Sequence, residues 1–280
     1  MSDLSGHISD DNLLLGALEA TGWHASFVPW DQRLVRWADF DCVVVRSTWD
    51  YHKRIDEFTD TLRSIDASTL LINPLEIMLW NTRKTYLREI SQLGLEPVPT
   101  LWTENLGRHD LTNAFHQFEV EEIIVKPVVG ANSDGIHRIS STAGDLDSAL
   151  TDLAGSSVMI QPFVRSIATD GEISLMYFNG FFSHAVRKRP RTGDFRSQQE
   201  HGAAFTILKP EDDLVAAGAA AIARLPKLPL YARLDFLPSD VPSAYWLVEL
   251  ELIEPSLFFT FDDSSPNRFA HALNEYMDRS

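Results

Sequence analysis

The chain has 280 residues, 44% hydrophobic and 23% charged, which is enough for a sizeable core and about two compact units. Its 24 Lys and Arg against 40 Asp and Glu give a formal charge of −16, which argues against nucleic acid or anionic membranes as partners. The single cysteine, Cys42, excludes an internal disulfide and fits a reducing compartment. The sequence has no apolar run of membrane-spanning length, and its first ten residues lack the features of a signal peptide. We therefore expect a cytoplasmic protein.

The first third of the chain alternates helix and strand. Apolar spacing predicts helices over 11–22 and 55–65, and β-branched or apolar runs predict strands over 40–46 and 69–73. This order indicates an α/β fold with a parallel sheet. The first strand opens into "RSTWDY", where such sheets usually bind ligands.

The rest of the chain begins with one expected helix over 76–93 and a linker stiffened by prolines. Asn179-Gly180 between two apolar runs predicts a β-hairpin, so the pattern becomes antiparallel and the C-terminal part reads as α+β. The further expected strands are 121–127, 158–164, 172–178, 181–189, 231–237 and 245–253, and the further helices are 146–153, 213–225 and 267–277.

Two lysines are candidates for phosphate binding. Lys126 leaves an apolar strand just before a loop with Gly130 and Gly135, and an ammonium beside free backbone N–H groups suits an oxyanion. Lys84 lies within the expected 76–93 helix. The alternative for both is ordinary solvent exposure, the usual state of lysine. The phosphate-binding pattern G-x-x-x-x-G-K-[ST] is absent from the sequence.

A basic cluster stands out in this acidic chain. It leads into the long polar segment 190–202, and a long loop in a compact domain is uncommon unless it is functional. A merely solvated loop is the competing interpretation. The basic residues are Arg187, Lys188, Arg189, Arg191 and Arg196.

Three carboxylates interrupt apolar strands near the C-terminus. Asp235 lies in "YARLDFL", and Glu249 and Glu251 lie on the same side of "YWLVELELI". If they meet across adjacent strands they repel one another, and a hard dication such as Mg²⁺ turns that repulsion into binding. The alternative is the solvated face of an antiparallel strand.

The turn after the first strand offers candidates for a substrate site. Arg46 is able to pair with a substrate carboxylate in a bidentate manner, with Ser47, Thr48 and Asp50 beside it. A capped turn with Trp49 in the core explains the same residues. Arg187 and Arg189 are further candidates.

The order of these features resembles the ATP-grasp superfamily, especially its glutathione-synthetase-like and ribosomal-protein glutamate-ligase-like branches. The resemblance rests on Lys84, Lys126 with its glycine loop, and then "MIQPFV", "DGEISL", "GDFRSQQEHG", "RLDF" and "ELELIEP" in that order. With "VVVRSTWDY" and "NPLEIMLWNTRKTYL" added, the chain is most similar to small bacterial ATP-grasp proteins that include O-ureidoserine cyclo-ligase.

This resemblance implies ATP and Mg²⁺, with two metal ions, as cofactors, and a role for each unusual residue. For the nucleotide these are Lys84, Lys126, Gly130, Ser133 and Gly135 at the phosphates, Gln161, Phe163 and Val164 at adenine, and Glu172 at the ribose. Lys188 and Arg196 would reach the transferring phosphoryl group from the large loop, and Asp235, Glu249 and Glu251 would hold the metal. Relatives carry Asn where this chain has Glu251, with one residue fewer before the proline, so Glu251 and Glu254 both remain candidates for the second glutamate ligand.

The implied architecture has three parts: an N-terminal α/β domain over 1–74, a small ATP-grasp lobe over 75–164 and a large antiparallel lobe over 165–280. Family members open with an apolar strand that this chain lacks, so we expect either that another element fills that sheet position or that a first segment is missing, which a longer native product would support. The oligomeric state stays open, and a homodimer is compatible with the sequence.

The implied reaction is ADP-forming ligation. ATP phosphorylates a small amino-acid-like carboxylate, and an amine or an internal nucleophile then displaces phosphate. Two alternatives are a kinase that phosphorylates a hydroxyl and a non-catalytic ATP-binding module.

Overall fold

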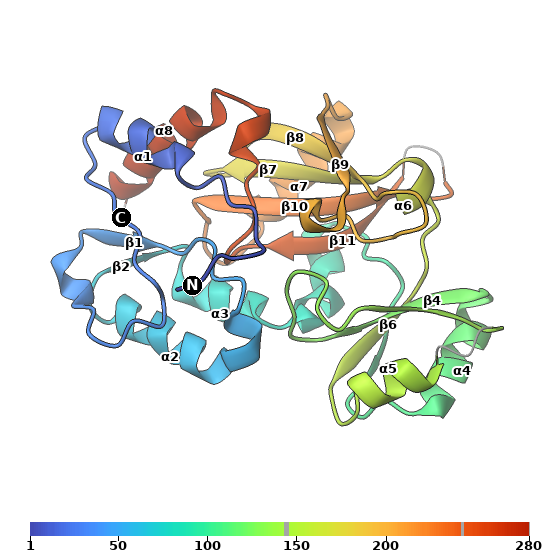
Figure 1. Cartoon of the computed structure of the whole chain (residues 1–280). Coiled ribbons are helices and arrows are strands. Elements are labelled where there is room, and N and C mark those ends of the chain that lie inside the picture. The colour runs from blue at the N-terminus through green and yellow to red at the C-terminus, as the bar shows by residue number, and fades with distance from the viewer. Residues whose placement is uncertain (143–145, 242–243, 280) are drawn as a thin grey trace.

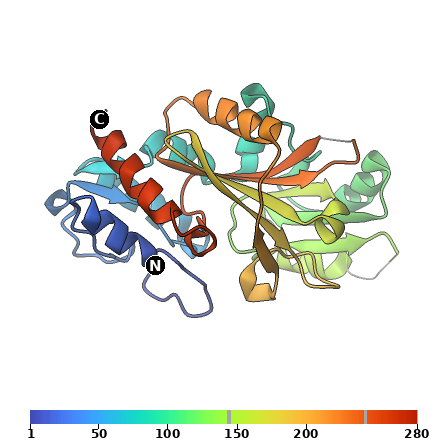
Figure 2. The same ribbon diagram turned by 90° about the horizontal axis from the view of Figure 1, so that it is seen from above.

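The structure is a computed structural model that describes residues 1–142, 146–241 and 244–279. The N-terminal part holds α1 (Leu13–Ala20), β1 (Cys42–Val44), α2 (Ile55–Asp66) and β2 (Leu70–Ile72), and β1 and β2 pair in parallel as predicted (Figure 1). The last helix, α8 (Ser265–Met277), returns to lie beside α1, and their apolar faces share one core (Figures 1 and 2). Both ends of the described chain therefore belong to the same region of the molecule.

The single helix expected over 76–93 is wrong. Helix α3 covers only Leu75–Asn81, Arg83 is extended, and two 3₁₀ turns follow over Lys84–Arg88 and Ile90–Leu93. Tertiary hydrogen bonds account for the break. The Asn81 amide donates to Leu250 O and accepts from Leu252 N, both at 2.8 Å, and Leu250 N donates to the Tyr86 hydroxyl at 2.9 Å. These bonds satisfy the outer edge of a neighbouring strand, which an uninterrupted helix would leave unpaired.

The small lobe is a four-stranded antiparallel sheet in the order β3-β6-β4-β5. Its strands are β3 (Leu101–Thr103), β4 (Glu122–Pro127), β5 (His137–Ser140) and β6 (Val158–Pro162). Helices α4 (Arg108–Phe118) and α5 (Leu146–Asp152) cover one face (Figure 1). Strand alternation buries Ile123 and Val125 under these helices, and it turns Ile124 and Lys126 toward a pocket on the other face.

The large lobe is a five-stranded antiparallel sheet in the order β11-β10-β7-β8-β9. Its strands are β7 (Glu172–Phe178), β8 (Phe181–Arg189), β9 (Ala204–Ile207), β10 (Tyr231–Pro238) and β11 (Tyr245–Glu251). The predicted hairpin joins β7 to β8, and Asn179 and Gly180 both have positive φ, as a tight hairpin turn requires. Helix α7 (Asp212–Ala223) packs on one face of this sheet.

The sequence did not lead us to expect four of these elements: β3, α4, β5 and β9. The two sheets belong to neighbouring parts of the molecule (Figures 1 and 2). Residues from both lobes and from the N-terminal segment line one pocket. Among the described helices, none combines the length and the apolar composition that crossing a membrane demands.

Candidate functional site

The pocket contains three carboxylates from two paired strands. Asp235 on β10 faces Glu249 on β11 in the antiparallel register, and Glu251 lies two residues along the same strand. One ligand oxygen from each of the three lies within 4.8 Å of the others. Oxygen ligands this close suit Mg²⁺, so the cluster fits the predicted metal site. Glu254 lines the same pocket but is not part of this group of three.

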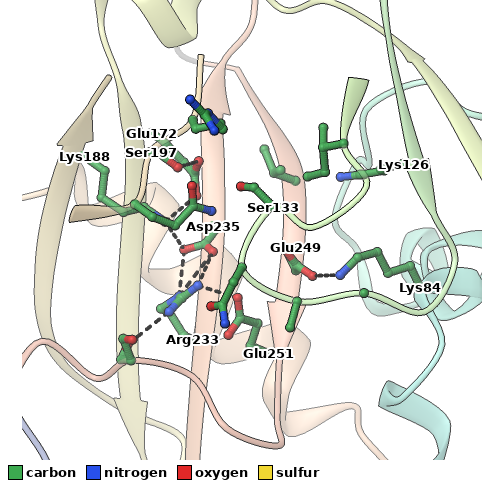
Figure 3. A pocket seen from close by; sticks show the side chains of 18 of the residues that line it. Lys84, Lys126, Ser133, Glu172, Lys188, Ser197, Arg233, Asp235, Glu249 and Glu251 are labelled. Atoms are coloured by element: carbon green, nitrogen blue, oxygen red, sulfur yellow. Dashed lines mark hydrogen bonds and ion pairs between the residues drawn. The ribbon is translucent and has the colours of Figure 1, made fainter. Parts of the chain in front are cut away.

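A buried arginine holds the cluster together, and the sequence reasoning missed it. Arg233 on β10 donates to Asp235 from Nε at 3.1 Å and from Nη2 at 2.9 Å, and its Nη2 also pairs with Glu251 (Figure 3). Its Nη1 donates to Ser256 O at 3.1 Å. A charged residue two positions before Asp235 in an apolar strand lies on the same face, and this was the available signal.

The electrostatics of the three carboxyls differ. Burial opposes ionisation of Asp235, yet Arg233 and Lys188 hold its pKa below the ordinary range. Burial likewise opposes ionisation of Glu249, and Lys84 and Lys126 keep its pKa low. For Glu251, burial together with the negative charges of Glu249 and Asp235 outweighs Arg233 and raises the pKa. The cluster therefore carries repulsion that a bound dication would relieve.

Neither predicted phosphate-binding lysine is solvent-exposed: Lys126 is buried, and the Lys84 side chain is 14% exposed. Lys84 forms an ion pair with Glu249, and its backbone N–H donates to Val128 O at 2.8 Å (Figure 3). Lys126 is 6% exposed, and burial lowers its pKa to about 8. An anion would compensate this desolvated ammonium.

The glycine loop beyond Lys126 turns back over the pocket. Asn132, Ser133 and Gly135 all have positive φ, and Gly130, Ser133 and their neighbours line the cavity. A Cβ on Gly130 would lie 3.0 Å from Pro127 Cγ, so this turn fits closely against the end of β4.

Lys188 lines the pocket, but it comes from a strand and not from the large loop, as had been predicted. It lies in β8, pairs with Glu172 and stands 3.4 Å from Asp235 (Figure 3). Glu172 also accepts from Ser197 Oγ at 2.7 Å. Lys188 therefore links the predicted ribose ligand to the predicted metal cluster. Arg196 does come from the loop, where it pairs with Asp194 at 2.8 Å and lines the pocket.

The residues predicted at adenine line the opposite wall. Gln161 Nε2 donates to Thr100 Oγ1 at 2.9 Å, and the Arg138 guanidinium lies 3.8 Å from the centre of the Phe163 ring. Val164 follows in the same lining segment. Contacts within the protein therefore hold Gln161 and Phe163 in this wall.

The substrate residues predicted after β1 do not join the pocket. Arg46 is buried and pairs with Asp11 at 2.8 Å, and the Ser47 hydroxyl donates to the same carboxylate. Asp50 accepts from Trp30 Nε1 at 2.8 Å and from Arg54 at 3.0 Å. Neither these three nor Thr48 belongs to the pocket lining formed by the described residues. The geometry instead matches the alternative interpretation, a folded turn with a buried Trp49.

Two residues that were not predicted to bind the substrate do line the pocket. Tyr51 and Glu254 are both buried and both line the pocket, and Trp49 Nε1 donates to Glu254 O at 3.0 Å. Burial and the charges of Glu251 and Glu249 raise the pKa of Glu254 to about 8. Tyr51 was missed, although it ends the "RSTWDY" motif.

Two family models match the chain. Residues 1–73 match the N-terminal domain of D-cycloserine synthetase DcsG, and residues 97–223 match the ATP-grasp domain of prokaryotic glutathione synthetase. Among curated relatives, the cycloserine biosynthesis protein DcsG of Streptomyces lavendulae is 31% identical over 94% of this chain and 92% of its own length. Glutathione synthetase of Prochlorococcus marinus is 27% identical over 62% of this chain and 56% of its own length.

Solved structures of related proteins are also similar to this chain. The crystal structure of D-cycloserine synthetase DcsG superposes with a TM-score of 0.85 at 28% identity, covering 95% of this chain and 94% of that one. The ATP-grasp ligase PsnB, complexed with its minimal precursor, has a TM-score of 0.65 at 17% identity, covering 95% and 97%. A RimK domain protein from Sphaerobacter thermophilus has a TM-score of 0.68 at 15% identity, covering 97% of both chains. The last two similarities concern the fold.

Proposed function

Because the chain belongs to the ATP-grasp superfamily, in the glutathione synthetase-like branch with DcsG, and is an ATP-dependent ligase that forms C–N bonds, we propose that its pocket activates a small amino-acid carboxylate. ATP and Mg²⁺ are its cofactors. One observation carries the proposal: three clustered carboxylates line the same cavity as Lys84 and Lys126. In this proposal residues 1–74 form the acceptor domain, and residues 75–164 and 165–280 form the two lobes that enclose ATP.

Asp235, Glu249 and Glu251 are the proposed metal ligands. Their oxygens gather within 4.8 Å, Arg233 pairs with Asp235 and Glu251, and Lys84 pairs with Glu249. When bound, Mg²⁺ would neutralise charge on the β- and γ-phosphates.

Lys84 and Lys126 are the proposed phosphate contacts from the small-lobe side, with the loop from Gly130 to Gly135 over them. Gln161, Phe163 and Val164 would line the adenine site, and Glu172 would accept hydrogen bonds from the ribose hydroxyls. Lys188 and Arg196 would stabilise the transferring phosphoryl group. Lys188 stands 3.4 Å from Asp235 and Arg196 lines the same pocket, and such basic side chains suit a reaction that depends mainly on charge neutralisation.

The proposed chemistry has two steps. A substrate carboxylate oxygen attacks the γ-phosphorus, and the bond to the bridging oxygen breaks to release ADP. A nitrogen nucleophile then attacks the acyl carbon and loses its proton, and phosphate leaves with the electron pair of the C–O bond. The loops around the pocket exclude water from the acyl phosphate.

ATP-grasp ligases act on small-molecule or peptide substrates. We favour a small molecule because the N-terminal segment narrows the pocket mouth. Ile8 N donates to Glu200 at 2.9 Å, and His52 pairs with Asp134 of the glycine loop at 3.1 Å. A peptide would have to displace these contacts. The relatives named for cycloserine make cyclisation of one serine-derived substrate the leading candidate, with O-ureidoserine as the first compound to try.

The test is ADP release with O-ureidoserine alone and with added amines, in the presence of ATP and Mg²⁺. We expect turnover with the single compound and a cyclised product in equal amount. Turnover only with a second amine would contradict cyclisation, and a stable phosphorylated product would indicate a kinase.

A further inference from the structure

Glu254 differs from every other acidic residue in the pocket. Seven acidic residues line it among the residues that the structure describes, and six of them have a partner. Lys84 pairs with Glu249, Arg233 with Asp235 and Glu251, and Lys188 with Glu172. At the mouth, His52 pairs with Asp134 and Ile8 N donates to Glu200. Within the described part of the chain, no other residue donates a hydrogen bond to the Glu254 carboxylate or forms an ion pair with it.

The backbone around Glu254 is fixed, so its position is not an accident of a loose loop. Trp49 Nε1 donates to Glu254 O at 3.0 Å, and the Tyr231 hydroxyl donates to Ile253 O at 2.7 Å. Pro255 follows and restricts the chain further. The residue is 8% exposed, and this exposure is toward the pocket that it lines.

Tyr51 brings a second unused polar group to the same place. Its ring packs against Phe58 with centroids 4.8 Å apart, and its side chain is buried but lines the pocket. Its hydroxyl has no hydrogen-bond partner among the described residues. Tyr51 follows two residues after Trp49, whose indole donates to Glu254 O, and burial together with the charge of Glu254 raises the Tyr51 pKa, so the phenol stays neutral.

We propose that Glu254 and Tyr51 form a subsite for the ammonium group of the amino-acid substrate, beside the metal cluster. This subsite rests on the proposed function, because it positions the carboxylate that the enzyme activates. A buried carboxylate without a partner is costly, and a ligand ammonium supplies both the missing charge and several N–H donors. The Tyr51 oxygen accepts a second N–H. One carbon separates ammonium from carboxylate in an α-amino acid, so binding here holds the carboxylate close to Glu251.

The residues that line this part of the pocket suit a small zwitterionic ligand better than a ligand with a positive charge alone. Trp49, whose indole donates to Glu254 O, is an apolar neighbour that restricts water at this end, and the metal cluster would supply positive charge for the substrate carboxylate when loaded. Glu254 as an additional metal ligand is the rival explanation.

The test is calorimetric and uses the full chain with Mg²⁺ and a non-hydrolysable ATP analogue. Its probes are D-serine, L-serine and 3-hydroxypropanoate, which is serine without its amino group. We expect at least one serine enantiomer to bind about tenfold or more tightly than 3-hydroxypropanoate. In Glu254→Gln this preference should disappear, and in Tyr51→Phe it should fall about threefold. Glu19→Gln, an exposed change on α1, is the matched control.

The affinity for the ATP analogue and the Mg²⁺ midpoint should stay within about twofold in Glu254→Gln. Equal binding of serine and 3-hydroxypropanoate by the unaltered protein, or a preference that persists in Glu254→Gln, would overturn the subsite. A tenfold higher Mg²⁺ requirement in Glu254→Gln would make Glu254 a metal ligand instead. If no carboxylate causes ADP release while the serine preference and its loss hold, the proposed function fails and the subsite stands.

Discussion

Asp235 and Glu249 lie directly opposite one another on paired strands β10 and β11, and their carboxylates share one small space with Glu251. Like charges placed opposite one another destabilise a sheet unless something compensates them. Arg233 and Lys84 compensate from the two sides, so the protein folds with the cluster assembled. The arrangement is ready for a dication before one binds.

The two glutamates of β11 should not be equivalent. Glu249 faces Asp235, whereas Glu251 is engaged by Arg233 and stands where relatives carry Asn. We predict that Glu249→Gln lowers kcat for ADP release by about 100-fold or more, because a proposed metal ligand facing the phosphates is lost. Glu251→Asn should retain much of the activity, with a changed Mg²⁺ midpoint. Mg²⁺ titrations of both variants check this, and equal losses would show that the two roles are wrongly assigned.

Arg233 should be required for both stability and metal affinity. Arg233→Met removes the common partner of Asp235 and Glu251 at a position only 8% exposed. Breaking a buried ion pair from one side costs about 3–5 kcal/mol. We expect a loss of that size in chemical denaturation without metal, partly recovered in excess Mg²⁺. A variant as stable as the parent at every Mg²⁺ concentration would contradict this role.

Gly171 should be needed to keep Lys188 in place. It has a φ of +82°, and a Cβ there would lie 2.6 Å from Lys188 O and 2.8 Å from Arg189 Cγ. Gly171→Ala must therefore displace β8, and we expect destabilisation by more than about 2 kcal/mol together with weaker ATP binding.

Gly155→Ala is the control for that change. Gly155 has a similar φ of +71°, but a Cβ there meets nothing within 4 Å. It should show only the backbone cost of about 1–2 kcal/mol and unchanged ATP binding. Equal effects of the two substitutions in denaturation and in ATP titration would contradict the account.

His184 should make the fold sensitive to mild acid. Burial lowers its pKa to about 4, and the ring bonds to Leu257 O and to Ser183 Oγ, each at 2.9 Å. The unfolded histidine titrates near pH 6.5, so between roughly pH 6.5 and 4 only the unfolded state takes up this proton. Stability should therefore fall as the pH falls through that window, by up to roughly 3 kcal/mol from this group.

The measurement is chemical denaturation at several pH values. His184→Gln should flatten the dependence across that window, whereas His109→Gln, an exposed change on α4, should leave it as in the parent. An unchanged slope in His184→Gln would rule out His184 as the cause.

The sequence predicted the family, the fold and the enzyme class correctly, because the features that carry them are local or ordered along the chain. Asn179-Gly180 specifies its hairpin through turn geometry, and strand alternation turns Glu249 and Glu251 the same way. The meeting of these residues with Asp235 required only that two neighbouring strands pair.

Features that depend on distant partners were not predictable in this way. The break after α3 exists because Asn81 and Tyr86 bond to β11, about 165 residues later. Arg46 was predicted to bind substrate, but Asp11, 35 residues earlier, neutralises it. Tyr51 and Glu254 line the same pocket only through the tertiary fold, and periodicity carries no sign of that.

The proposed reaction depends on activation of the substrate as an acyl phosphate. Isotope transfer from a substrate labelled with ¹⁸O in its carboxylate tests it most directly, with O-ureidoserine as the first compound, ATP and Mg²⁺. Mass spectrometry of the released phosphate should find one ¹⁸O atom per turnover, matching the ADP formed. ADP release with phosphate that carries no ¹⁸O would exclude an acyl phosphate.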